Sequence, residues 1–205
     1  MTKSTFKLFM VNKNLQQIMG YLIFDYSSNK IHITSLLVYP EFQKQGVGTV
    51  LMIFFICFVI NNIDDAKFIK KISLDDCSAL NRTKDSIYYK FCYRISDSFN
   101  EEKMELNFLT TMTDYKIKKQ YTYPDESFPS VINFSTIYDY YNHLLDKYNE
   151  ILEKIKLNKD NIIFEMSYYD YQTKNTQHIK YLDIDNCLIK KEDMSNNYFL
   201  RSTVR

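Results

Sequence analysis

Two glycines separated by a single residue, Gly46 and Gly48, constrain the fold of this chain more than any other feature. The sequence holds only three glycines in 205 residues, where average usage of roughly 7% gives about fourteen. Glycine allows a sharp turn or the close approach of a ligand because it has no Cβ atom. A chain this poor in glycine keeps it where other residues do not fit. We therefore expect the pair to mark a turn around which the rest of the fold is built.

The glycine pair lies between an apolar strand pattern, Ile31 to Val38, and an apolar helix pattern that begins at Val47. The start of a helix offers unpaired N–H groups and the positive end of the peptide dipoles. A strand, a glycine turn and a helix N-terminus in this order form a site for an anion, most often a phosphate. A tight turn that binds nothing is an equally open interpretation of this spacing.

The residues after the glycines exclude two better-known phosphate loops. The Walker pattern has Lys followed by Ser or Thr directly after its last glycine, where this chain has Thr49 and Val50. The dinucleotide-binding pattern has a third glycine three residues further on, where this chain has Leu51. If the pair binds a phosphate, it does so in a different kind of loop.

The spacing Gln43-x-x-Gly46-x-Gly48, after an apolar strand and a Val-x-Pro sequence, resembles the acetyl-CoA loop of the GNAT superfamily of N-acetyltransferases. In that family the loop N–H groups hold the pyrophosphate of coenzyme A, and the preceding strand hydrogen-bonds its pantetheine arm. The resemblance implies the coenzyme-binding residues Leu37, Val38, Gln43, Lys44, Gln45, Gly46, Val47, Gly48 and Thr49.

A second segment of the chain also resembles this family. Its members commonly carry an Asn seven residues before the Tyr of a Tyr-x-Lys-x-Gly-Phe segment, and Asn81 and Tyr88 keep that spacing. The resemblance implies that Asn81 orients the amide arm of the coenzyme and that Tyr88 donates a proton to the leaving thiolate. Helix capping by Asn81 and plain packing by Tyr88 are the structural alternatives. Cys92 stands where the family usually has glycine, and the family's first strand and helix pair, which help to bind the acceptor, are missing or very short.

An amine acceptor needs a base, because a lysine amino group has a pKa of about 10.4 and must lose a proton before it attacks a thioester. In the family that this chain resembles, the usual base is a carboxylate near the split in the sheet. Asp75 and Asp76 end the strand predicted from Phe68 to Leu74. We favour Asp75, because alternation places it opposite the apolar residues of the strand, while capping of the following turn is its structural alternative. A backbone N–H group of the Leu36 to Val38 segment would hold the oxyanion.

The order of the predicted elements indicates an α+β fold (α/β in the broad sense). Three strands in a row suggest an antiparallel meander, and a helix then crosses over to a fourth, parallel strand. The resulting GNAT-like fold has a mixed, mostly antiparallel central sheet flanked by helices, and the resemblance covers roughly residues 5 to 96. The predicted elements are strands at Phe6–Val11, Ile18–Tyr26, Ile31–Val38 and Phe68–Leu74 and a helix from Val47 to about Asn62.

Beyond residue 96 the resemblance fades. We divide the chain into a GNAT-like acetyl-CoA-binding domain, residues 1–115, and a helical and β C-terminal extension, residues 116–205, packed on the first domain. Apolar residues at three- and four-residue steps predict an amphipathic helix over about residues 135–157. Residues 162–171 and 179–184 are expected to form a hairpin.

Charge and composition exclude several classes of function. The 26 basic and 25 acidic side chains nearly cancel, so we expect no nucleic-acid partner. The longest apolar run, Val50 to Ile60, is about half of what a bilayer-spanning helix needs; it predicts a core helix covered on both sides, with the extension as the cover. The four cysteines are widely spaced, with no CxxC pair and no secretion signal. We therefore expect no metal site, no disulfide framework and a cytoplasmic location.

The leading hypothesis is an acetyl-CoA-dependent N-acetyltransferase that transfers an acetyl group to a primary amine by direct attack in a ternary complex. Whether the acceptor is a small molecule or a protein stays open, as does a homodimer formed through the amphipathic helix. The alternatives are a coenzyme-binding module that has lost catalysis and a protein-interaction domain that uses the tyrosine-rich C-terminal half.

Overall fold

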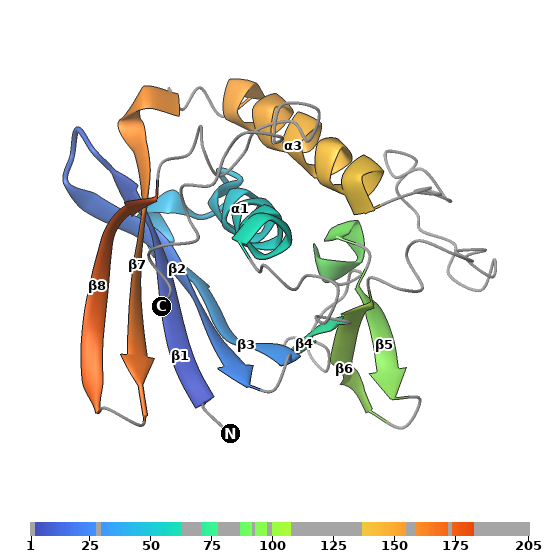
Figure 1. The fold of residues 1–205 in the computed structure, drawn as a ribbon. Helices are drawn as coiled ribbons and strands as arrows, with labels where there is room; N and C mark the ends of the chain where they lie inside the picture. Colours follow the sequence, from blue (N-terminus) through green and yellow to red (C-terminus); the bar gives the residue numbers. More distant parts are fainter. Residues whose placement is uncertain are drawn as a thin grey trace.

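The computed structural model describes residues 3–27, 30–62, 71–77, 87–91, 93–97, 100–107, 137–154, 159–171 and 174–182. Within these ranges a curved sheet holds one helix, α1, in its hollow, and a second helix, α3, lies over the first (Figure 1). The strands are β1 (Lys3–Asn12), β2 (Gln17–Ser27), β3 (Lys30–Val38), β4 (Lys71–Asp75), β5 (Arg94–Asp97), β6 (Asn100–Asn107), β7 (Ile162–Asp170) and β8 (Asn175–Leu182). The helices are α1 (Val47–Asn62), α3 (Ile137–Lys154) and the 3-10 helices η1 (Pro40–Phe42), η2 (Ile87–Phe91) and η3 (Lys159–Asn161).

The eight described strands form one sheet in the order β5-β6-β4-β3-β2-β1-β7-β8. Neighbouring strands are antiparallel except for β3 and β4, which run parallel. This confirms the predicted α+β class with a mixed, mostly antiparallel sheet. The parallel pair follows from the crossover through α1, because a helix returns the chain to the end of the sheet from which it left. The predicted start of β4 lies among residues 63–70, outside the described residues.

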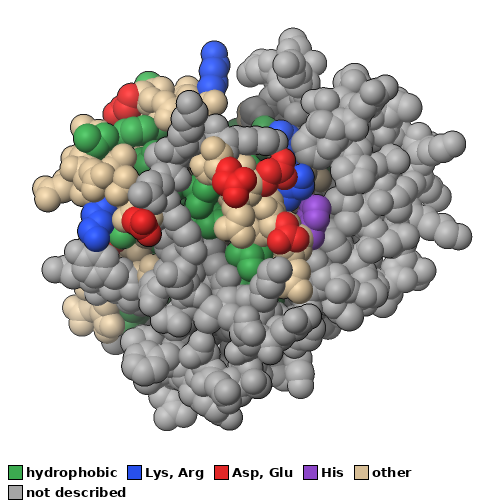
Figure 2. All heavy atoms as spheres, turned by 90° about the horizontal axis from the view of Figure 1, so that it is seen from above, with side chains coloured by type: hydrophobic (Ala, Val, Ile, Leu, Met, Phe, Trp, Pro, Cys, Tyr) green, Lys and Arg blue, Asp and Glu red, His purple; other side chains and the backbone are tan. Residues whose placement is uncertain are grey.

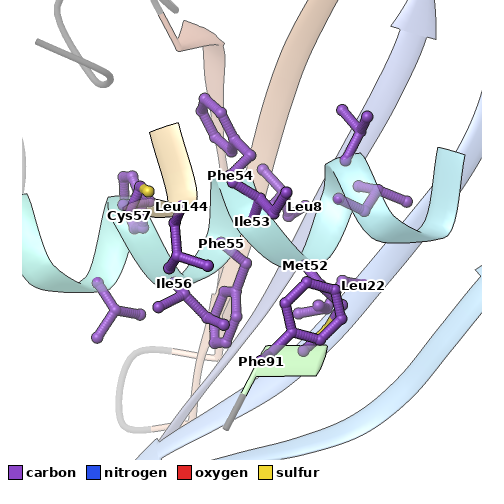
Figure 3. Close-up of a cluster of buried hydrophobic side chains, with 14 of the residues drawn as sticks. Leu8, Leu22, Met52, Ile53, Phe54, Phe55, Ile56, Cys57, Phe91 and Leu144 are labelled. Carbon is purple, nitrogen blue, oxygen red and sulfur yellow. The ribbon is translucent and has the colours of Figure 1, made fainter. Parts of the chain in front are cut away.

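Helix α1 is buried on all sides, as its lack of a polar face requires. Every side chain from Val50 to Ile60 is buried. The ring of Phe54 stacks on Phe164 of β7 with centroids 3.7 Å apart, and Phe55 lies 4.8 Å from Phe24 of β2. The close-up of this core shows side chains from the sheet around α1 together with Leu144 of α3 (Figure 3). The C-terminal helix therefore supplies the second cover that the sequence predicts for α1.

The C-terminal strands continue the sheet that the N-terminal strands begin. Strand β7 pairs with β1 along nearly its whole length, and β8 forms a hairpin with β7. Strand β8 begins at Asn175, four residues earlier than the apolar pattern indicates, because its first residues are exposed and polar. The predicted domain boundary at residue 115 lies outside the described residues. The division into two domains stays a prediction.

His143 of α3 gives this helix a pH-dependent stability. The outward side of α3 exposes acidic and basic side chains (Figure 2), and His143 lies half-buried among them. Burial, and then the charge of Lys147, lower the pKa of His143, while Asp146 and Glu150 act in the opposite direction. The folded protein therefore takes up this proton less readily than the unfolded chain, so stability is lost as pH falls below the ordinary histidine pKa of about 6.5.

We expect the melting temperature to fall between pH 7 and pH 5 and to fall less in His143→Gln. Glutamine keeps a polar side chain of similar length but takes up no proton in this range. Thermal unfolding followed by circular dichroism at half-unit pH steps measures the two slopes. Equal slopes in the two proteins would contradict the assignment to His143.

Candidate active site

Strands β3 and β4 separate halfway along β3. The two strands pair only between Ile31–Ile33 and Ile72–Leu74, and β3 then continues to Val38 beside β2 alone. Thr34 is an extra residue in the register of β3 against β2, which is a β-bulge. A bulge bends its strand and increases the local twist. Because the bulge lies where the pairing with β4 ends, it accounts for the open edge of β3 after Thr34.

Leu36 and Val38 direct their backbone N–H groups toward this open edge. The N–H group of Tyr39 donates to the carbonyl of Met19 on β2 at 3.1 Å, and successive residues of a strand point to opposite sides. Val38 and Leu36 therefore face away from β2. In agreement, the Val38 carbonyl accepts a hydrogen bond from the side chain of Gln43 at 3.1 Å. The open edge thus offers two N–H groups about 7 Å apart.

Gly20 allows β2 to approach β3 closely beside Leu37. A Cβ atom on Gly20 would lie 2.6 Å from the carbonyl oxygen of Leu37, so only glycine fits at this position. The same contact shows that the Leu37 carbonyl faces β2. Of the two strand residues predicted to bind coenzyme, Val38 directs its peptide groups to the open edge and Leu37 does not.

The loop after β3 presents a row of backbone N–H groups at the end of the open edge. Lys44 and Gly46 have left-handed φ angles of 60° and 79°, and the side chain of Gln45 donates to the Glu41 carbonyl at 2.8 Å. The backbone N–H groups of Val47, Gly48 and Thr49 precede the first hydrogen bond of α1, in which the Val50 N–H group donates to the Gly46 carbonyl at 3.0 Å. Together with the N-terminal end of α1, they form a place where an anion is stabilised.

The two glycines of this loop are expected to respond differently to replacement by alanine. We expect Gly46→Ala to lower the free energy of unfolding by about 1–2 kcal/mol, because Gly46 has a left-handed φ angle of 79°. Gly48→Ala is the matched control: its Cβ atom would meet a Val38 methyl group at 3.4 Å, an ordinary contact. Urea unfolding of both variants measures the difference. Equal stabilities would show that the loop relaxes out of this conformation at no cost.

The two candidate carboxylates at the end of β4 lie in different surroundings. Asp75 is exposed on the strand face opposite the buried Ile72 and Leu74, as alternation predicts. Asp76 follows the last residue of the strand and is only 3% exposed. Its N–H group donates to the carbonyl of Glu102 on β6 at 2.6 Å. Asp76 lies two residues after Leu74 and four after Ile72, so the same alternation places its side chain on the buried face, sheltered from water.

Tyr88 lies on η2, within electrostatic range of this buried carboxylate. Burial, and then the negative charges of Asp76 and Cys77, raise the pKa of Tyr88 to about 12. Its ring centroid lies 6.0 Å from that of Tyr93, whose pKa is also raised well above the usual value, mainly by burial. Tyr88 is therefore protonated at neutral pH and can donate a hydrogen bond. Asn81, which is predicted to orient the amide arm of the coenzyme, lies outside the described residues, as does Cys92.

The topology brings these groups to one end of the sheet. Because β3 and β4 are parallel neighbours, their carboxyl ends lie at the same edge of the sheet. The N–H groups of Leu36 and Val38 lie on one side of the split, and Asp76 lies at the end of the strand on its other side. The negative charge of Asp76 contributes to the raised pKa of Tyr88, so the two groups lie within electrostatic range of each other.

Two further results concern metals and membranes. Among the described residues, no group of three or more His, Cys, Asp or Glu side chains is placed to hold a metal ion. No helix in the described ranges is both long and apolar enough to cross a membrane.

The mixed, mostly antiparallel sheet, split between β3 and β4 with a glycine loop and a helix N-terminus at the end of the split, agrees with a GNAT-like α+β fold. Residues 3–70 match the model of the Acetyltransferase (GNAT) family, the family that the glycine loop resembles. The match includes β1, β2, β3, the loop and α1 and ends before Asp75, Asp76 and Tyr88. Searches of curated proteins and of solved structures find no match to the chain.

Proposed function

We propose that the protein is an acetyl-CoA-dependent N-acetyltransferase that transfers the acetyl group to a primary amine by direct attack in a ternary complex. The observation that carries this proposal is the turn with left-handed φ angles at Lys44 and Gly46, which leads into the N-terminus of α1 at the end of an open strand edge. A ligand that joins a diphosphate to an extended arm with amide groups matches both features. Acetyl-CoA is such a ligand.

In this proposal the loop and the strand edge bind different parts of the coenzyme. The diphosphate lies at the N–H groups of residues 44–49, with the exposed side chain of Lys44 as a counter-charge. Val38, next to the loop, binds the pantetheine arm. The N–H group of Leu36, about 7 Å further along the strand, donates a hydrogen bond to the thioester oxygen as negative charge develops on it.

Asp76 is our candidate base, because its shelter from water suits the proton transfer better than the exposed position of Asp75. The amine nitrogen attacks the thioester carbon, and its proton passes to Asp76 directly or through a water. The bond between carbon and sulfur then breaks, the thiolate leaves, and a proton passes to the sulfur. The product is an acetylated amine and free coenzyme A.

The pKa of Tyr88 limits how it helps the leaving group. An ordinary thiol has a pKa of about 8.5, whereas the pKa of Tyr88 is raised to about 12. The phenol is then the weaker acid of the two, so full transfer of its proton to the thiolate is unfavourable. Tyr88 therefore stabilises the departing sulfur as a hydrogen-bond donor, and the sulfur receives its final proton from another source.

Coenzyme binding and thiol release test this proposal directly. Calorimetry with coenzyme A should show binding, and phosphopantetheine, which lacks the diphosphate, should bind more weakly. Purified protein with acetyl-CoA and a panel of amines, including a polyamine, a lysine peptide and a peptide with a free N-terminus, should release thiol with at least one acceptor. If the protein shows no coenzyme binding and no thiol release with any acceptor, the proposal is wrong.

A second candidate function follows from the extent of the family match. The match ends at residue 70, before the candidate base and Tyr88, so it covers the coenzyme loop without the catalytic residues. A coenzyme-binding module without catalysis is consistent with this. Tight binding of acetyl-CoA without turnover would favour the module, whereas turnover that Tyr88→Phe lowers would exclude it.

A further inference from the structure

A buried hydrogen bond connects the C-terminal helix to the segment that carries Tyr88. The hydroxyl group of Tyr140 on α3 donates to the backbone carbonyl of Phe91 at 2.9 Å. Tyr140 is 1% exposed and Phe91 is 2% exposed, so water does not replace this bond easily. Phe91 is the last residue of η2, three residues after Tyr88. A contact from α3 therefore holds the short helix on which the candidate hydrogen-bond donor lies.

Helix η2 depends on contacts with other elements for its position. It is a 3-10 helix of five residues, and such helices have poorer hydrogen-bond geometry than α-helices. The side chain of Phe91 packs into the core beside α1 (Figure 3), which anchors one end of η2. The N–H group of Tyr93 donates to the Tyr88 carbonyl at 3.2 Å, which closes the turn. The hydroxyl of Tyr140 adds a directional contact, which fixes the orientation of the η2 backbone.

We propose that Tyr140 is a positioning residue that holds Tyr88 at the split of the sheet through the Phe91 carbonyl, so that the C-terminal helix completes the active site. This inference rests on the proposed acetyl transfer. A displacement of a catalytic group by about 1 Å can cost 10²-fold in rate. Loss of the Tyr140 hydroxyl leaves the ring in place, so it should displace η2 by less than about 1 Å. We therefore expect Tyr140→Phe to lower kcat by about tenfold and to leave the KM for acetyl-CoA unchanged, because the loop and Val38 do not contact α3 through this bond.

A double-mutant cycle tests whether Tyr140 acts through Tyr88. Activity is measured for Tyr140→Phe, Tyr88→Phe and the double variant, with unfolding temperature as a check on folding. If Tyr140 positions Tyr88, removing the Tyr140 hydroxyl lowers kcat in the wild type but not in the Tyr88→Phe background. Tyr169→Phe is the matched control, because the Tyr169 hydroxyl forms no hydrogen bond within the described residues. It should keep wild-type kcat.

Hydrogen exchange supplies a readout that does not depend on activity. In full-length Tyr140→Phe, the Tyr93 N–H group should exchange about tenfold faster, since the turn that it closes is less well held. N–H groups between β1 and β2 should exchange at wild-type rates. The positioning role is overturned if kcat and Tyr93 exchange are unchanged, or if Tyr140→Phe lowers kcat by the same factor with and without Tyr88. A wild-type protein without turnover would instead end the proposed function, and the exchange rate alone would then decide whether Tyr140 holds η2.

Discussion

We expect Asp76→Asn to lower kcat for acetyl transfer by about 10²- to 10⁴-fold, while Asp75→Asn keeps a value close to that of the wild type. Asparagine has nearly the same size as aspartate but cannot take up the proton of the amine. Asp76 is 3% exposed at the end of β4, whereas Asp75 is exposed to solvent on the other side of the strand end. The two variants change neighbouring residues in the same way, so they separate the effect of the buried carboxylate from that of the exposed one.

The pH dependence of the Asp76→Asn variant gives an independent check. Without a base, only amine molecules that have already lost their proton react, so the rate should rise about tenfold per pH unit toward the amine pKa of about 10.4. Tyr88 stays protonated through this range because its pKa is raised to about 12. Coenzyme affinity by calorimetry and the unfolding midpoint serve as controls. A loss of activity in Asp75→Asn, with Asp76→Asn still active, would show that Asp75 is the base.

The sequence predicts the N-terminal half of the fold well because its signals are local. Alternating apolar residues give β1, β2 and β3 within a few residues of their ends, and the long apolar run gives α1 with both ends as predicted. The glycine loop is equally local, since its chemistry lies in consecutive backbone N–H groups. These features need no knowledge of which distant elements come together.

The partners of these elements are not local and could not be predicted in this way. Nothing in the hairpin formed by β7 and β8 shows that it joins the free edge of β1, because that edge accepts any strand of suitable length. The bulge at Thr34 could not be predicted from the sequence either, because it lies where the pairing of β3 with β4 ends.

The candidate site shows the same limit in part. Alternation places Asp75 opposite the apolar residues of β4 and Asp76 on the same face as Ile72 and Leu74, and Asp76 is the buried carboxylate. Tyr140 is one of 18 tyrosines, and only the packing of α3 brings its hydroxyl to the Phe91 carbonyl. The two-residue spacing from Ile72 and Leu74 marks Asp76 as inward-facing, whereas no spacing in the sequence marks Tyr140.

We expect Phe54→Ala to lower the free energy of unfolding by about 3–5 kcal/mol. Phe54 is fully buried on α1, and its ring lies parallel to that of Phe164 on β7, with centroids 3.7 Å apart and an interplanar angle of 4°. The side chain therefore joins the helix of the family-matched segment to a C-terminal strand. Its removal leaves a cavity between two rigid elements that cannot easily close.

Phe9→Ala is the matched control, because Phe9 is a half-buried phenylalanine on β1 and is not part of the buried core. It should cost about 1 kcal/mol. Urea unfolding of both variants, and of Phe164→Ala and the double variant with Phe54→Ala, measures the coupling across the interface. The double variant should cost less than the sum of the single changes, because each removes the same ring contact. Additive losses, or a Phe54→Ala cost no larger than that of Phe9→Ala, would show that α1 and β7 do not share one core, and residues 1–115 and 116–205 would then be expected to unfold separately.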